Sequence, residues 1–214
     1  MTAVDEGFAA RLREGTREEH ERAERAVFVE SLLAGRLGIE AYTGMLRQSY
    51  LFYSVLEDAG ERWRGDPVVG GFVVDGLLRR DALGADLEFL VGAGWRAGVR
   101  PLGATGSYVE RIREVCFDDR AAFVAHHYTR YLGDLSGGQV IRRRMREVYG
   151  MVDDGVRFYD FSGVGKVKAF RDRYRELLSA APWGEEGRAG VVAEANMAFR
   201  LNRAVFADLA AVHC

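Results

Sequence analysis

The stretch Tyr128-Thr-Arg-Tyr-Leu-Gly-Asp-Leu-Ser-Gly-Gly-Gln139 places three glycines in a segment that is otherwise typical of a helix. Residues 120–127 before it and 140–149 after it have helical composition. Each glycine costs up to about 1 kcal/mol in a helix interior relative to alanine, so some gain must offset that cost. We predict a helix that bends here and lets its bare backbone lie against a flat partner.

The spacing of the glycines supports a bent, exposed backbone. Gly133 and Gly137 are four residues apart and therefore share one face of a helix. Small residues at this spacing let a backbone approach another surface closely, and Gly137-Gly138 permits a kink. The alternative interpretation is a tight crossing with another helix of the same protein.

Helical periodicity extends through the rest of the 214-residue chain. Apolar residues at i, i+3, i+4 and i+7 spacing run along 42–56, and leucines mark another helix at 83–90. The three prolines lie near expected boundaries, and the sequence shows no hairpin signal, repeat or low-complexity linker. We expect a single all-α domain spanning residues 1–214, with further helices at 104–115, 118–149, 164–178 and 187–211.

The N-terminal part has its own helix signal. Thr16-Arg-Glu-Glu19 is a capping-box pattern and predicts a helix over 17–26. This helix carries His20 near its start and Glu24 one turn later. A lone helical histidine is commonly structural or exposed. A hydrogen bond from Nδ1–H of His20 to Glu24 would instead leave Nε2 free to bind a metal.

Arg130 and Asp134 form an i, i+4 pair within the glycine-rich stretch. A surface salt bridge of this kind contributes only about 0.3–0.5 kcal/mol. Asp134, however, follows Gly133 directly, on the turn that would face a bound ligand. A carboxylate at that position can hold ordered water.

Two further groups of basic residues stand out. His126 and His127 point to different helix faces, so they cannot chelate one metal together, and we interpret them as structural. Arg171 and Arg175 share one face within a run of cationic residues. Such a run is commonly a solvated face, but guanidinium groups are also well suited to clamp carboxylates.

Composition excludes several classes of protein. The formal net charge of −2 gives no sign of a nucleic-acid-binding surface. Cys116 and Cys214 are far apart and fit neither a disulfide framework nor a metal-binding spacing. The acidic N-terminus lacks a signal-peptide core, and no apolar run approaches the ~18 residues of a membrane span. We expect a cytoplasmic protein that does not bind membranes, and a monomer because no extended apolar seam appears.

The chain resembles the heme oxygenases, in particular the soluble bacterial-type enzymes. The resemblance covers nearly the whole length, and the Tyr-Leu-Gly-Asp-Leu-Ser-Gly-Gly-Gln block is its most specific element. A histidine at the expected distance upstream strengthens it. The matching segments are 16–24, 51–57, 128–139, 158–161 and 198–202.

The resemblance implies a role for each matching residue. His20 matches the proximal ligand of the heme iron, with Glu24 as its hydrogen-bond partner. Asp134 matches the distal carboxylate that organises water on the opposite side of the heme. The other matches are the distal-network residues Tyr53, Arg130 and Asn202, the distal-helix residues Gly133, Ser136 and Gly137 beside the heme, and the propionate contacts Arg13, Tyr128, Arg171 and Arg175.

The resemblance also implies the fold and the reaction. Heme b is expected to lie between a proximal and a kinked distal helix of a helical bundle, as both substrate and cofactor. Its ring is cleaved to biliverdin, CO and Fe²⁺ with O₂ and with electrons from an external ferredoxin, flavodoxin or reductase. The positions of Arg13 and Arg171 are typically lysine in the family. Because a guanidinium is larger and binds bidentately, the seat of the heme and the biliverdin isomer are left open.

Three alternatives remain open at this point. A thiaminase-like hydrolase of the same fold needs a nucleophilic cysteine in a pocket, and neither cysteine is well placed. A di-iron oxidase needs carboxylates and histidines on facing helices. A heme storage or delivery protein would keep His20 and the propionate contacts but would not need Asp134 and the distal network.

Overall fold

The structure is a computed structural model that describes residues 7–214. The N-terminal residues 1–6, where no signal peptide is expected, lie outside the described part. The expected all-α class is confirmed, because residues 7–214 form helices and connecting loops with no strand. The helices are α1 (Phe8–Glu24), α2 (Val27–Leu33), α3 (Ile39–Trp63), α4 (Arg80–Val91), α5 (Gly103–Val115), α6 (Arg120–His127), α7 (Gly133–Ser136), α8 (Gly138–Tyr149), α9 (Val167–Ala180) and α10 (Glu185–His213).

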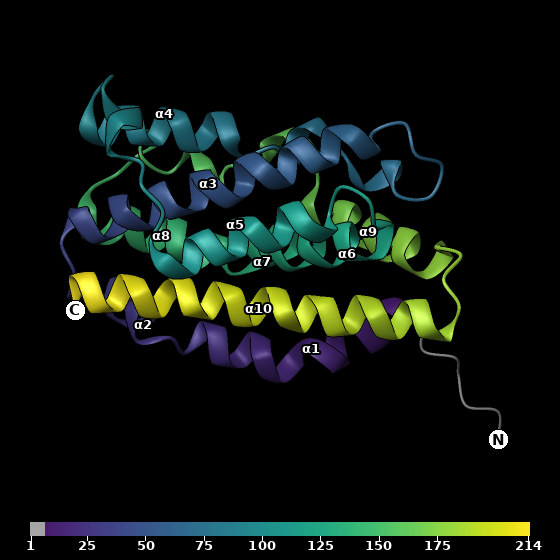
Figure 1. Cartoon of the computed structure of the whole chain (residues 1–214). Coiled ribbons are helices and arrows are strands. Elements are labelled where there is room, and N and C mark those ends of the chain that lie inside the picture. Colours follow the sequence, from purple (N-terminus) through teal and green to yellow (C-terminus); the bar gives the residue numbers. More distant parts are fainter. Residues whose placement is uncertain (1–6) are drawn as a thin grey trace.

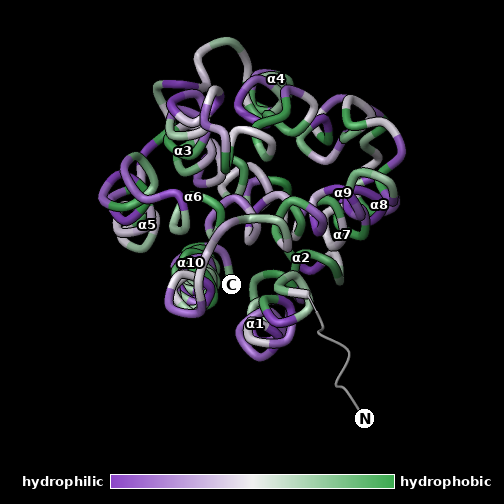
Figure 2. Tube along the Cα trace, turned by 90° about the vertical axis from the view of Figure 1, so that its right-hand side faces the viewer, coloured by the Kyte–Doolittle hydropathy of each residue, from purple (hydrophilic) through white to green (hydrophobic). Residues whose placement is uncertain are grey.

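The long helices lie roughly along one direction and form a bundle (Figure 1). Helix α10 runs the length of the molecule and packs against α1, α5 and α6, while α3 packs against α4 and α5. Viewed end-on, α1 and α10 lie side by side at one edge and α4 lies at the opposite edge (Figure 2). Short 3-10 turns connect the helices: η1 (Gly70–Phe72), η2 (Asp75–Leu77), η3 (Trp95–Gly98), η5 (Arg157–Tyr159) and η6 (Ser162–Val164).

The start of the first helix differs from the prediction. Helix α1 begins at Phe8 rather than after Thr16. Phe8 and Leu12 are fully buried one turn apart, so burial of this apolar face extends the helix toward the N-terminus. Thr16 is buried in mid-helix, and its hydroxyl donates to the carbonyl of Leu12 across 2.8 Å instead of capping a helix end.

In place of the single helix expected over 118–149, the structure has four consecutive helical segments, α6, η4 (Tyr128–Leu132), α7 and α8. Asp119 caps α6, since its carboxylate accepts hydrogen bonds from the backbone N–H of Ala121 and Ala122. Residues Tyr128–Leu132 then form a π-helical turn, η4, before α7. One turn residue, Gly137, separates α7 from α8, and its backbone angles, φ −65° and ψ −35°, are those of a right-handed helix. Single π turns occur frequently at functional sites.

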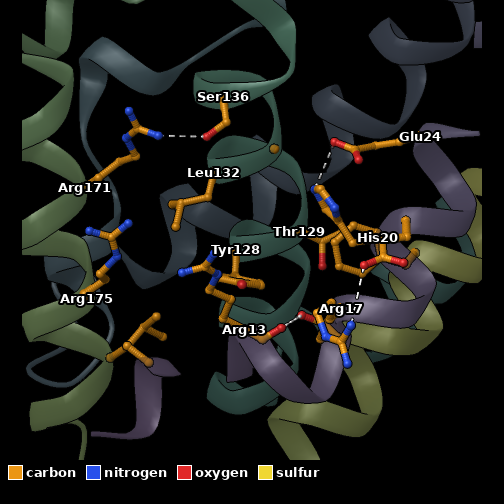
Figure 3. A pocket seen from close by; sticks show the side chains of 16 residues that line it. Arg13, Arg17, His20, Glu24, Tyr128, Thr129, Leu132, Ser136, Arg171 and Arg175 are labelled. Carbon is orange, nitrogen blue, oxygen red and sulfur yellow. Dashed lines mark hydrogen bonds and ion pairs between the residues drawn. The ribbon is translucent and has the colours of Figure 1, made fainter. Parts of the chain in front are cut away.

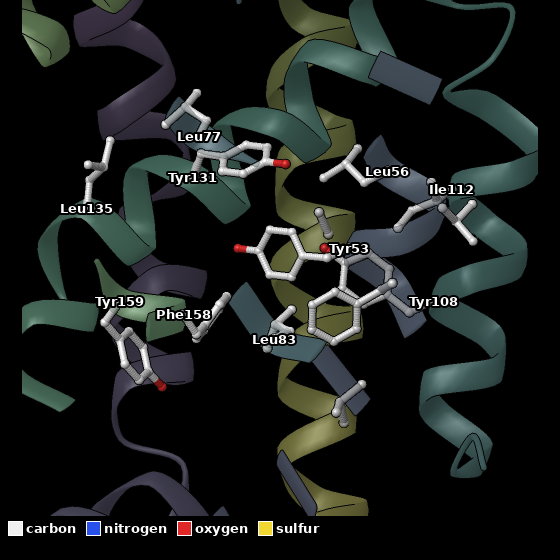
Figure 4. Close-up of a cluster of buried hydrophobic side chains, with 14 of the residues drawn as sticks. Tyr53, Leu56, Leu77, Leu83, Tyr108, Ile112, Tyr131, Leu135, Phe158 and Tyr159 are labelled. Atoms are coloured by element: carbon white, nitrogen blue, oxygen red, sulfur yellow. The ribbon is translucent and has the colours of Figure 1, made fainter. Parts of the chain in front are cut away.

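An aromatic cluster fills the core behind the π turn. Tyr53 lies among Tyr131, Tyr108 and Phe158 (Figure 4). The Tyr53 ring meets Tyr131 and Phe158 edge-on, each at a centroid separation of 5.4 Å. Such edge-to-face pairs are favourable beyond the area they bury. This packing fixes the position of η4 and α7 from the interior side, so the opposite side of these turns is left to form the wall of a cavity.

No helix among residues 7–214 combines the length and the apolar character that crossing a membrane requires.

Candidate active site

A cavity of about 510 Å³ opens between α1, the η4–α7 segment and α9 (Figure 3). This volume is within the range of pockets that hold small organic ligands. Eight of the residues predicted for the site line it: Arg13, His20, Glu24, Tyr128, Gly133, Ser136, Arg171 and Arg175.

The side of the cavity formed by η4 and α7 is called the distal wall here. The glycines in and next to it serve two different purposes. A Cβ atom at Gly133 would meet nothing within 4 Å, and at Gly137 it would meet only the carbonyl oxygen of Gly133, at 3.5 Å. A Cβ at Gly138 would instead lie 2.8 Å from the ring of Tyr159. Gly138 therefore packs closely within the protein, but against the short turn η5 rather than at the crossing with another helix that the alternative interpretation expected. That interpretation does not fit Gly133, whose bare backbone faces the open cavity.

His20 lies across the cavity from this wall, on α1 (Figure 3). Its side chain is 43% exposed, and its ring stands edge-on to Phe199 of α10 at 5.4 Å between centroids. The contact with Glu24 differs from the one expected. Oε1 of Glu24 lies 3.8 Å from Nε2 of His20, which is an ion-pair distance from the other ring nitrogen rather than a hydrogen bond to Nδ1.

Positive charge gathers at the end of the cavity away from Glu24. Arg171 and Arg175 enter from α9, and Arg13 enters from α1 (Figure 3). Burial raises the pKa of the Tyr128 phenol, and the nearby charges of Arg13 and Arg175 oppose this rise. Nη1 of Arg171 donates to Oγ of Ser136 across 3.0 Å. These guanidinium groups can receive a ligand that carries more than one carboxylate.

Gly137 is not among the residues that line the cavity, contrary to expectation. The other four predicted residues, Asp134, Tyr53, Arg130 and Asn202, form a second group behind the wall. Asp134 does not line the cavity, contrary to expectation, because each residue turns a helix by about 100° and Asp134 points inward from Gly133. Its Oδ2 accepts a hydrogen bond from the Tyr53 hydroxyl. Arg130 lies 3.8 Å from Oδ1 of Asp134 and donates to Oδ1 of Asn202 across 2.5 Å.

This pair of charges is not the surface salt bridge that the spacing alone suggested. The side chains of Arg130 and Asp134 are only 9% and 15% exposed, and the guanidinium of Arg130 lies over the rings of Phe52 and Tyr53. Burial raises the pKa of Asp134, while the charge of Arg130 and the Tyr53 hydrogen bond oppose the rise. Burial therefore favours the neutral form of this carboxyl group, and its two partners favour the charged form.

Several residues of the site were not predicted. Thr129 and Leu132 line the cavity together with Tyr128, Gly133 and Ser136, and this spacing follows one face of a helix. Helical periodicity within the glycine-rich stretch could have identified them. Phe199 lies inside the segment 198–202 that matches the family, but nothing in its neighbours marks it as a cavity residue.

Other candidate groups have structural roles. His126 is fully buried, and its Nε2 lies 2.9 Å from Oε1 of Glu194. His127 is buried as well, with Nδ1 2.9 Å from the hydroxyl of Tyr174. Cys116 is buried away from the cavity, and burial raises the pKa of its thiol, so it lacks the character of a nucleophile.

A di-iron centre requires a cluster of ligands. Within residues 7–214 the structure brings together no group of three or more histidine, cysteine, aspartate or glutamate side chains that could hold a metal ion. The di-iron alternative therefore has no candidate ligand set in the described part of the chain.

Comparisons with known proteins show similarity over nearly the whole chain. The sequence model of the heme oxygenase family matches residues 6–208. Heme oxygenase 1 of the cyanobacterium Synechocystis sp. is 35% identical over 202 residues, which cover 94% of this chain and 84% of the relative. The heme oxygenase of Porphyra purpurea is 37% identical over 203 residues, covering 94% of this chain and 86% of the relative.

Solved structures show the same similarity. The crystal structure of the Synechocystis heme oxygenase-1 in complex with heme superposes with a TM-score of 0.91 at 34% identity, covering 96% of this chain and 93% of that one. The heme oxygenase of Leptospira interrogans superposes with a TM-score of 0.88 at 33% identity, covering 94% of this chain and 98% of that one.

Proposed function

This chain belongs to the heme oxygenase family, and we propose that it binds heme in the cavity between α1 and the η4–α7 segment and cleaves it to biliverdin, CO and Fe²⁺. The single observation that carries the proposal is that the open backbone of Gly133 lines the cavity, whereas the equally open backbone of Gly106 in α5 does not line it. A helical glycine with nothing within 4 Å of a Cβ position costs about 1 kcal/mol and gains nothing from packing within the protein. A flat ligand lying against that backbone supplies the missing gain.

The residues around the cavity suit a heme. His20 offers an imidazole nitrogen for the iron from the wall opposite Gly133. Arg13, Arg171 and Arg175 offer guanidinium groups for the two propionates. Among residues 7–214, Glu24 is the carboxylate nearest to the His20 ring, at 3.8 Å from Nε2. In a side-chain conformation of His20 that turns Nδ1 toward Glu24, this carboxylate would fix the ring and increase the basicity of the ligating nitrogen.

Heme is the substrate here and also supplies the chemistry by which O₂ is activated. The chain's own contribution is to place hydrogen-bonding groups on the distal side. Gly133 and Gly137 leave room above the ligand because they have no side chains. Asp134 follows Gly133 in the sequence, and its carboxylate lies behind the distal wall, where it contacts Tyr53 and Arg130. A carboxylate held in this way can orient ordered water and exchange a proton with it.

The reaction also needs co-substrates that the chain does not supply. O₂ and electrons from a ferredoxin, a flavodoxin or a reductase complete the reaction as the family carries it out. We infer one domain over residues 1–214, consistent with the family match over 6–208. The monomeric state and the cytoplasmic location expected from the sequence stay predictions.

The test is to mix the purified protein with one equivalent of hemin, add a reductant in air and follow the visible spectrum. We expect a sharp Soret band that decays toward the absorption of biliverdin while CO is released. A stable heme spectrum that never turns over would favour storage or delivery. Failure to bind hemin would refute both functions.

The role of His20 is tested in the same assay. His20→Ala should lose the histidine-ligated spectrum and most of the activity, and added imidazole should restore both. His213→Ala is the matched control, since His213 lies at the end of α10 near Phe28 and outside the cavity. An unchanged spectrum in His20→Ala would refute the ligand assignment.

A further inference from the structure

The contact between α1 and α10 pairs two consecutive residues of one helix with two consecutive residues of the other. The two helices lie side by side at one edge of the bundle (Figure 2). On the cavity side, the His20 ring stands edge-on to Phe199 at 5.4 Å between centroids. At the neighbouring residue of each helix, Oε1 of Glu19 lies 3.9 Å from Nη1 of Arg200. The contacts of Glu19 therefore bear on the position of the His20 ring.

Glu19 is a carboxylate enclosed by guanidinium groups. Its side chain is only 13% exposed, and Nη1 of Arg203 lies 3.2 Å from its Oε2. Nη1 of Arg22 donates to its Oε1 across 3.2 Å. Within residues 7–214, no other carboxylate lies within 4 Å of Arg200 or Arg203. Glu19 is therefore the counter-charge that lets these two arginines of α10 lie against α1.

The preceding turn of α1 brings the two helix backbones close together. A Cβ atom at Gly15 would lie 2.7 Å from Cγ1 of Val192, and Nδ2 of Asn196 donates to the carbonyl oxygen of Gly15 across 2.9 Å. Gly15 and Glu19 are four residues apart and share one face of α1. Close packing thus holds α1 to α10 at one turn and ion pairs hold it at the next, where His20 lies.

We propose that Glu19 is a positioning residue, whose ion pairs with Arg200 and Arg203 fix the turn of α1 that carries His20 and so set the approach of the imidazole to the heme iron. The inference rests on the proposed function, in which His20 is the iron ligand. Glu19 acts through His20, because it does not itself line the cavity. Without its charge, the guanidinium groups around it would repel one another, and the contact between α1 and α10 would loosen.

Two other roles for Glu19 make different predictions. A carboxylate near the iron ligand could act through its negative charge alone, and then any carboxylate beside it on α1 would have the same effect. Glu19 could also stabilise the fold without bearing on the ligand. Its removal would then lower the free energy of unfolding and leave the bond between iron and histidine unchanged.

The experiment compares Glu19→Gln, Arg203→Gln and the combined variant. The matched control is Glu18→Gln, which removes the adjacent charge; Glu18 pairs with Arg22 within α1 and is 78% exposed. The hemin complexes are measured by the iron–histidine stretching frequency of the reduced form in resonance Raman spectra and by the rate of hemin release to excess apomyoglobin. The hemin-free proteins are measured by urea unfolding and by amide hydrogen exchange of α1.

We expect Glu19→Gln to lower the stretching frequency, because the imidazole is held less firmly toward the iron. Hemin should be released about three- to tenfold faster, the range of one hydrogen bond, and the amides of α1 should exchange faster. Arg203→Gln leaves Glu19 two partners and should have a smaller effect. In the combined variant one repelling charge is gone, so hemin should be released more slowly than from Glu19→Gln alone. Glu18→Gln should match the wild type.

An unchanged stretching frequency in Glu19→Gln would overturn the inference, whatever the loss of stability in urea. Equal effects of Glu18→Gln and Glu19→Gln would overturn it too, as would faster hemin release from the combined variant than from Glu19→Gln. Arg203→Gln breaks the same contact at an arginine that is 38% exposed, so its stretching frequency decides the matter if Glu19→Gln fails to fold. Each of these results leaves the proposed function standing. A wild-type hemin complex without a histidine ligand would instead refute the proposed role of His20, and the inference with it.

Discussion

The hydroxyl of Tyr53 on α3 donates a hydrogen bond to the carboxylate of Asp134 on α7, and this bond links helices 81 residues apart in the sequence. Both groups are withdrawn from solvent. Burial raises the pKa of Asp134, and the Tyr53 hydrogen bond opposes that rise by stabilising the charged form. The tyrosine therefore helps to keep an acceptor charge behind the distal wall.

Tyr53→Phe should move the pH dependence of turnover. Without the hydroxyl, the pKa of Asp134 rises further, so the carboxylate becomes protonated at a higher pH. The acidic limb of the activity profile should shift upward by roughly one pH unit, the equivalent of one hydrogen bond. Tyr50→Phe on the same helix is the control, because Tyr50 packs edge-on against Trp95 outside the site. Identical profiles for both variants would exclude a role for the Tyr53–Asp134 bond.

Asp134→Ala should separate binding from turnover. Asp134 does not line the cavity, so hemin should bind with a similar affinity. Biliverdin formation should fall by about 100-fold, the lower end of what a positioned acid–base group contributes. The measurement is single-turnover biliverdin yield beside a hemin titration. Normal yield in this variant would remove Asp134 from the mechanism.

The sequence predicted the helical fold well but placed some boundaries wrongly, for identifiable reasons. The periodicity of 42–56 and the other segments is a local property, and the helices expected from it are found. The short helix α2 was not predicted. The capping-box pattern at Thr16 misled the prediction of α1, because the same residues occur in mid-helix once Phe8 and Leu12 are buried upstream. The π turn at 128–132 leaves no trace in composition.

The candidate site, like the helix boundaries, could be predicted only in part from the sequence. The structure brings eight predicted residues together around the cavity. Five of them lie in the matching segments 16–24 and 128–139, and the three arginines Arg13, Arg171 and Arg175 lie outside the matching segments. The burial of Arg130 and Asp134 could not be predicted, since an i, i+4 pair of charges has the same spacing on a surface and in a core. This pair is buried because Tyr53 and Asn202, which belong to helices distant in sequence, pack against it and form hydrogen bonds with it.

Gly133→Ala should increase the stability of the protein and weaken its binding of hemin. A Cβ at this position meets no protein atom within 4 Å, so the free energy of unfolding should rise by up to about 1 kcal/mol through helix propensity. The same methyl group enters the cavity and should weaken hemin binding. Urea unfolding without hemin and a hemin titration measure the two effects.

Two other glycines provide controls for this prediction. Gly106 in α5 also has nothing within 4 Å of a Cβ position, so Gly106→Ala should stabilise the protein without any change in hemin binding. Gly138→Ala should destabilise it by about 1–3 kcal/mol, since the new methyl group meets the Tyr159 ring at 2.8 Å. Equal hemin affinity in Gly133→Ala and Gly106→Ala would contradict the placement of the ligand against Gly133.

His127 should make the protein sensitive to acid. Its imidazole is buried among aromatic rings, and burial lowers its pKa from 6.5 to about 3. In the unfolded chain the same group takes up a proton near its ordinary pKa. The stability that neutral His127 contributes is therefore complete above pH 6.5 and is lost as the pH falls toward 3. One proton of difference corresponds to a slope of about 1.4 kcal/mol per pH unit.

Urea unfolding between pH 7 and pH 4 measures this slope. His127→Phe should be less stable at neutral pH but should lose stability less steeply on acidification, because the titrating group is gone. Tyr174→Phe is the matched control: it removes the hydroxyl that lies 2.9 Å from Nδ1 of His127 and keeps the imidazole. We expect Tyr174→Phe to retain the wild-type slope. If His127→Phe retained it as well, the acid sensitivity would have to come from other buried groups, such as His126, whose pKa is also lowered by burial.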